Sequence, residues 1–60
     1  MAKLTSIDVK LHIKDLVELG EDPHTPEFWD RVRMFVASFA TMQERITLIH
    51  LCTQWSKDYL

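Results

Sequence analysis

Apolar residues recur at helical spacing through the middle of the chain. Five of them follow one another at intervals of four, three, one and three residues: Phe28, Val32, Phe35, Val36 and Phe39. At about 100° per residue this spacing gathers them on one face of an α-helix. Polar residues, among them Asp30 and Arg33, fall on the opposite side. The pattern therefore predicts an amphipathic helix over residues 26–40.

The turn-forming residues indicate where a first helix ends and this second one begins. Gly20 can adopt the left-handed backbone conformation that closes a helix, and it follows an apolar run. Thr25, Pro26 and Glu27 are typical of a helix start, with Thr25 as N-cap and Pro26 at the first helical position. Neither glycine nor proline occurs after Pro26, so the rest of the chain should be helical.

The pattern after residue 40 fits either one long helix or two helices. Thr41 and Glu44 match the capping box that starts a new helix at Met42, although the alternation of four and three residues continues across this point. A later apolar stripe, which runs from Leu48 to Tyr59, lies roughly 160° from the Phe28–Phe39 stripe on a continuous helix. A straight helix would therefore carry two opposed apolar faces. We predict a break near residues 40–41 and a third helix over 42–59.

The first segment also allows two interpretations. Residues 7–13 alternate between apolar and polar side chains, as a half-buried strand does. A lone strand would need a second chain for pairing, and the apolar pattern continues at helical spacing up to Leu19. Helix over residues 6–19, with Ser6 as N-cap, is the favoured interpretation.

These elements predict a single all-α domain over residues 1–60, a helical hairpin or a small three-helix unit. The first and third segments carry more apolar residues than three short helices can cover, so we expect a homodimer that completes the core. The expected self-association residues all lie in the third segment: Ile46, Leu48, Ile49, Leu51, Cys52, Trp55 and Tyr59.

Composition removes several classes. Apolar residues make up 47% and charged residues 27% of the 60 residues, a balance typical of a globular chain. One cysteine excludes an internal disulfide, no apolar leader follows Met1, and no uncharged run approaches the about 20 residues of a membrane span. We therefore expect a cytoplasmic protein.

No residue pattern predicts catalysis, a cofactor or a metal. His50 and Cys52 are two positions apart, so on a helix they point about 200° from each other and cannot act as base and nucleophile. Cys52 fits a small buried hydrophobe better. His24 lies near Glu21 and Asp22, but their spacing fits a solvated loop better than a metal site. An enzyme is not expected.

The charge distribution is the remaining clue. Residues 15–30, the acidic segment, hold six carboxylates and no lysine or arginine: Asp15, Glu18, Glu21, Asp22, Glu27 and Asp30. Some of these acids complement a helix dipole, but the excess would also attract a basic protein surface and repel nucleic acid.

The leading hypothesis is a small module that binds, and regulates or inhibits, a partner protein. The expected partner-binding residues are Glu18, Glu21, Asp22, Glu27, Trp29 and Asp30, with Trp29 as the anchor, and charge reversal at Glu21 and Asp22 should weaken binding. One alternative is a dimeric DNA-binding regulator that uses Arg31, Arg33 and Arg45, although the acidic balance disfavours nucleic acid. Another is a structural subunit that only self-assembles.

Overall fold

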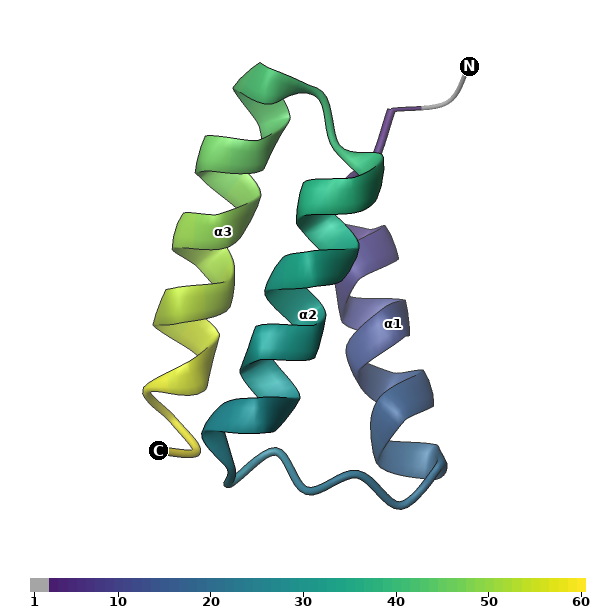
Figure 1. The fold of residues 1–60 in the computed structure, drawn as a ribbon, viewed down its shortest axis with the longest axis vertical. Coiled ribbons are helices and arrows are strands. Elements are labelled where there is room, and N and C mark those ends of the chain that lie inside the picture. Colours follow the sequence, from purple (N-terminus) through teal and green to yellow (C-terminus); the bar gives the residue numbers. More distant parts are fainter. Residues whose placement is uncertain (1–2) are drawn as a thin grey trace.

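Three helices account for most of the 60-residue chain. A computed structural model describes residues 3–60, in which α1 (Ser6–Glu18), α2 (Pro26–Phe39) and α3 (Met42–Ser56) follow one another. α1 and α3 run in the same direction, and α2 runs against both of them (Figure 1). The prediction of an all-α unit of three helices is confirmed, and the described residues contain no strand, so the helical interpretation of residues 7–13 is the right one. Each helix ends one to three residues before its predicted end.

α1 begins at Ser6, as predicted, but its N-cap lies one residue earlier than predicted. Thr5, not Ser6, is the N-cap: the Thr5 hydroxyl accepts a hydrogen bond from the Asp8 backbone N–H at 3.3 Å. In return, the Asp8 carboxylate accepts the backbone N–H of Thr5 at 2.9 Å. This reciprocal pair satisfies two N–H groups that the first helical turn leaves without a partner, which a cap at Ser6 would not do.

The connection from α1 to α2 begins at Gly20, as predicted. Gly20 has a φ of 95°, in the left-handed region that a glycine adopts without steric cost. The following N–H, of Glu21, donates to the carbonyl of Leu16 at 3.0 Å, which closes the helix. Thr25 is the N-cap of α2 by backbone position, but its hydroxyl donates to the carbonyl of Asp22 at 2.8 Å instead of capping the helix. The start of α2 therefore depends on Pro26 and on this turn.

The predicted break between the second and third helices is confirmed. Ala40 leaves the helix with a ψ of 150°. Thr41 then caps α3: its hydroxyl accepts from the Glu44 N–H at 3.3 Å, and the Glu44 carboxylate accepts from the Thr41 N–H at 3.1 Å. The two helices consequently fold back as a tight antiparallel hairpin.

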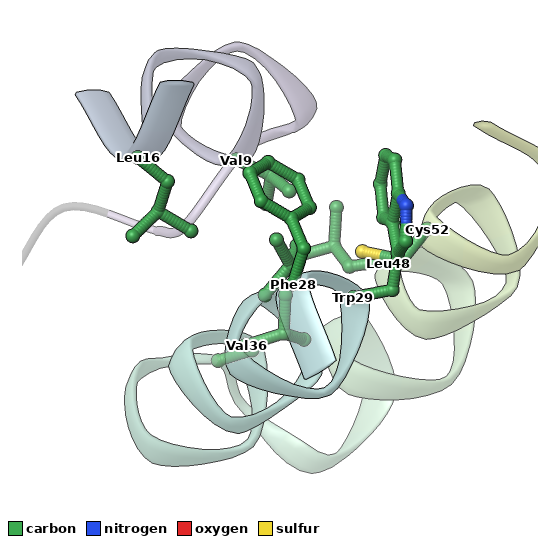
Figure 2. Close-up of a cluster of buried hydrophobic side chains, with 9 residues drawn as sticks. Val9, Leu16, Phe28, Trp29, Val36, Leu48 and Cys52 are labelled. Atoms are coloured by element: carbon green, nitrogen blue, oxygen red, sulfur yellow. The ribbon is translucent and has the colours of Figure 1, made fainter. Parts of the chain in front are cut away.

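The core lies where the three helices meet (Figure 2). Within residues 3–60 it consists of nine buried residues: Val9, Leu16, Phe28, Trp29, Val32, Val36, Ala40, Leu48 and Cys52. Most of the predicted stripe of α2 is buried, but Phe39 is 69% exposed. Phe39 is the last residue of α2, where its ring rests on Phe35 with 5.2 Å between centroids instead of entering the core.

Candidate functional site

The fold gathers the acidic segment at one end of the bundle. The last turn of α1, the loop and the first turns of α2 meet there, and the C-terminus lies at the same end (Figure 1). Five of its six acids are exposed, and Glu21 is half-buried. The backbone of the acidic segment therefore lies at one end of the bundle.

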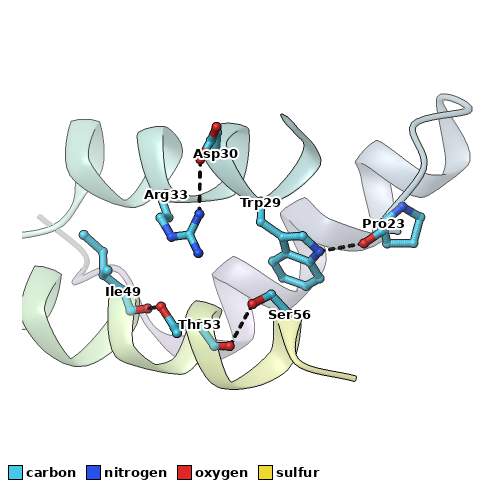
Figure 3. Close-up of polar contacts among 7 residues, drawn as sticks. All are labelled: Pro23, Trp29, Asp30, Arg33, Ile49, Thr53 and Ser56. Atoms are coloured by element: carbon cyan, nitrogen blue, oxygen red, sulfur yellow. Dashed lines mark hydrogen bonds and ion pairs between the residues drawn. The ribbon is translucent and has the colours of Figure 1, made fainter. Parts of the chain in front are cut away.

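Three of these six acids have roles within the chain. Glu21 forms an ion pair with Arg31 at 2.8 Å. Asp30 forms one with Arg33 at 3.2 Å, which Figure 3 shows. The carboxylate of Asp22 accepts the backbone N–H of His24 at 2.9 Å and so shapes the loop. Glu21 and Asp22 are thus poor choices for a pure test of partner binding.

The helix dipole explains one of the remaining three acids. Glu27 lies in the first turn of α2, where a negative charge is favourable. Asp15 and Glu18 lie in the last turn of α1, where the carbonyl groups already carry partial negative charge and that turn has no basic residue. Among residues 3–60 neither acid forms an ion pair. Within the described residues, these two charges therefore oppose the helix dipole without an ion pair to offset that cost.

The structure corrects the predicted role of Trp29. Trp29 is only 1% exposed, and its indole N–H donates to the carbonyl of Pro23 at 2.7 Å (Figure 3). A side chain buried in this way cannot insert into a partner. It instead holds the loop against α2 and α3.

The aromatic groove, lined by Lys10, Ile13, Trp29, Trp55, Asp58 and Tyr59, encloses about 290 Å³ beside the acidic segment. Trp29 forms part of its lining, with its ring centroid 5.7 Å from that of Tyr59. The ammonium of Lys10 lies over the ring of Trp55, 5.5 Å from the centroid. Sequence reasoning missed this groove because its residues come from distant segments.

Contacts between the loop and the C-terminal turn hold one side of the aromatic groove. His24 Nδ1 lies 2.8 Å from the backbone carbonyl oxygen of Tyr59, and the two rings meet edge to face at 5.5 Å. The buried hydroxyl of Ser56 donates to the carbonyl of Thr53 at 2.7 Å (Figure 3). The groove is thus built on fixed backbone, although Tyr59 lies beyond the end of α3.

The seven predicted self-association residues divide into four groups. Leu48 and Cys52 lie in the core of the single chain, which removes them from any interface in this fold. Ile49 and Leu51 are partly buried against the core, and Trp55 and Tyr59 line the aromatic groove. Ile46 is 74% exposed.

The structure also shows the surroundings of Cys52 and of the three arginines that the sequence suggested as a DNA-binding face. Burial raises the pKa of the Cys52 thiol, and the charge of Arg33 offsets part of that rise. Arg31 and Arg33 are paired with acids, and Arg45 donates to the carbonyl of Ala37 at 3.0 Å. Each arginine of the supposed DNA-binding face is therefore engaged within the chain.

Metal-ligand clusters and membrane-spanning helices are both absent from the described residues. Within residues 3–60, no three histidine, cysteine or acidic side chains gather as metal ligands. None of the helices in that range has the length and apolar character needed to cross a bilayer.

Comparison with known proteins found no match. No family model, no curated protein and no solved structure is significantly similar to this chain. A proposal about function therefore rests on the residues and contacts of the chain itself.

Proposed function

We propose that this protein is a small interaction module that binds a basic surface of a partner protein through its acidic segment, and regulates or inhibits that partner by occupying the surface. The observation that carries this proposal is the position of Asp15 and Glu18 in the last turn of α1. Charges that oppose the helix dipole lower stability by about 0.3–1 kcal/mol each, and neither acid gains an intramolecular ion pair within residues 3–60. Residues that lower the stability of the fold, with no contact within the chain that compensates for it, are expected at functional sites.

The rest of the acidic segment supports the same conclusion. Glu27 adds another exposed carboxylate at this end. Arg31 and Arg33 offset the charges of Glu21 and Asp30, and the other four carboxylates of the acidic segment form no ion pair within residues 3–60, so the segment keeps a negative potential. Such a field accelerates encounter with a basic surface and makes the association sensitive to salt. Duplex nucleic acid would be repelled by the same field.

The test compares two variants that change net charge equally. Asp15→Asn combined with Glu18→Gln removes two negative charges from the acidic segment. Gln43→Lys combined with Thr47→Lys adds two positive charges at exposed positions of α3, near the other end of the bundle. Both double variants have a formal net charge of zero, since the parent chain carries −2.

The immobilised chain is used to capture partner proteins, which are then purified and titrated against all three forms. We expect the first double variant to bind a captured basic protein more weakly, with a shallower dependence on salt, and to be more stable in urea unfolding than the parent. The second double variant should bind as the parent does. Equal affinity for the parent and the Asp15→Asn, Glu18→Gln variant would contradict the proposal.

A further inference from the structure

The aromatic groove has the chemistry of a site for an organic cation. The faces of aromatic rings carry partial negative charge and attract an ammonium group within about 6 Å of their centroid. Here Trp55 and Tyr59 flank the buried ring of Trp29, and the carboxylate of Asp58 lines the same groove. Among residues 3–60, Asp58 forms no ion pair that would neutralise it.

A lysine of the chain itself already places its ammonium group in the aromatic groove. The ammonium of Lys10 lies 5.5 Å from the centroid of Trp55. Lys10 is an exposed residue of α1, so its side chain can move into solvent without disturbing the core. The face of Trp55 therefore accepts an alkylammonium group that a second one can replace.

The size and position of the groove limit what can enter. About 290 Å³ lies at the lower end of the range for small-molecule sites, which suits one side chain better than a large ligand. The groove borders the acidic segment, because Tyr59 is bonded to His24 of the loop and Trp29 to Pro23. A cation drawn to the acidic segment would meet the groove beside it.

We infer that the aromatic groove receives a lysine side chain of the basic partner, which displaces Lys10 from the face of Trp55 and places its ammonium near Asp58. This inference rests on the proposed function and names the chemistry by which the partner would be recognised. The acidic segment would supply long-range attraction, and the groove would supply the anchor that the buried Trp29 cannot.

The probe is N-acetyl-lysine methylamide, titrated into the full chain while the indole N–H resonances of both tryptophans are followed by NMR. We expect the resonance of Trp55 to shift with the lysine amide and much less with the neutral N-acetyl-norleucine methylamide. In Lys10→Met, which keeps an apolar stem but removes the competing charge, the lysine amide should bind about two- to five-fold more tightly. Lys14→Met is the matched control on α1, since Lys14 does not line the groove.

The carboxylate is tested by Asp58→Asn, an exposed position whose replacement should leave the fold intact. We expect this variant to bind the lysine amide up to about five-fold more weakly than the parent. Equal shifts with the norleucine amide, or equal affinities in Lys10→Met and Lys14→Met, would overturn the inference.

These measurements involve no partner protein, so they separate the two proposals. A groove that binds the lysine amide, in a chain whose partner is insensitive to Asp15→Asn and Glu18→Gln, would refute the proposed function alone. Partner binding that depends on the acidic segment, together with a groove that ignores the lysine amide, would refute the groove alone.

Discussion

The ring of His24 joins the interhelical loop to the C-terminal turn, with Nδ1 lying 2.8 Å from the backbone carbonyl oxygen of Tyr59. Because a carbonyl oxygen only accepts, Nδ1 must carry the hydrogen. The bond spans 35 residues of sequence and ties down a segment that follows the last helix. It is one of few side-chain bonds that connect distant parts of the described chain.

We expect His24→Ala to lower the free energy of unfolding by about 1 kcal/mol, because one hydrogen bond and one edge-to-face ring contact are lost. The same change should increase amide hydrogen exchange at residues 57–60, where the C-terminal turn loses its tether. Urea unfolding and hydrogen exchange measure the two effects. His50→Ala is the matched control, because His50 is an exposed histidine whose ring is hydrogen-bonded, within residues 3–60, to its helical neighbour Gln54 and not to the C-terminal turn. Unchanged exchange at residues 57–60 in His24→Ala would refute the tethering role.

The buried indole of Trp29 stabilises the fold both by packing and by one hydrogen bond. Two substitutions measure these contributions separately. Trp29→Phe removes the part-buried bond to the carbonyl of Pro23, at a cost of about 1–3 kcal/mol. Trp29→Ala also removes most of the ring from the core and should cost about 3–5 kcal/mol, enough to unfold a domain of this size. Circular dichroism with urea titration distinguishes them. A stability of Trp29→Ala within 1 kcal/mol of the parent would mean that Trp29 is not a core residue.

Features encoded by neighbouring residues could be predicted from the sequence, and features that depend on helix packing could not. The helix break at Ala40 and Thr41 follows from a capping box four residues long, and Gly20 closes α1 by its own backbone conformation. The edge of the α2 stripe, where Trp29 lies, is a different case. Whether an edge residue faces solvent or a neighbour depends on where α3 crosses, which no local pattern specifies.

The candidate site shows the same division. The acidic segment is contiguous in sequence, so its charge was predictable, whereas the intramolecular pairing of Glu21 with Arg31 required the fold. The aromatic groove unites Lys10 with Trp55, which lie 45 positions apart. The apolar pattern led to the prediction that Trp55 and Tyr59 take part in self-association. Such a pattern shows which residues are hydrophobic, but not which element each ring packs against.

The two capping boxes provide a prediction about local stability. Thr5→Ala and Thr41→Ala should each lower the free energy of unfolding by about 1 kcal/mol, because each removes the acceptor for an N–H of the first helical turn. Thr47→Ala, at an exposed position of α3 beyond its first turn, should be neutral or slightly stabilising, since alanine is the better helix former. Equal effects of Thr41→Ala and Thr47→Ala in urea unfolding would show that the box contributes nothing.

The buried thiol of Cys52 predicts a loss of stability at alkaline pH. Burial raises the pKa of this thiol, so the folded chain keeps its proton at pH values where the unfolded chain releases it. The associated stability is complete below the unfolded pKa of about 8.5 and falls as the pH rises from there through the folded value. Cys52→Ala should be less stable at neutral pH because of the lost packing, but the difference from the parent should shrink between about pH 8 and 10. A constant difference over that range would contradict the assignment.

The homodimer remains a prediction. The exposed apolar residues of α3 are the ones that would have to form its interface. Ile46 and Met42 are one helical turn apart on α3 and are 74% and 78% exposed, whereas Leu48 and Cys52 are already used in the core. We expect light scattering to give a mass of about 14 kDa, twice the 7.1 kDa of one chain, with dissociation on dilution.

Ile46→Glu should shift the population to monomer with unchanged helicity. A charge is costly at the desolvated contact of a dimer, whereas in the single chain this side chain is exposed to water. Gln54→Glu, a charge change at another exposed position of α3, should leave the mass unchanged. A mass of one chain at every concentration would refute the dimer, and the exposed residues of α3 would then be free for a different protein.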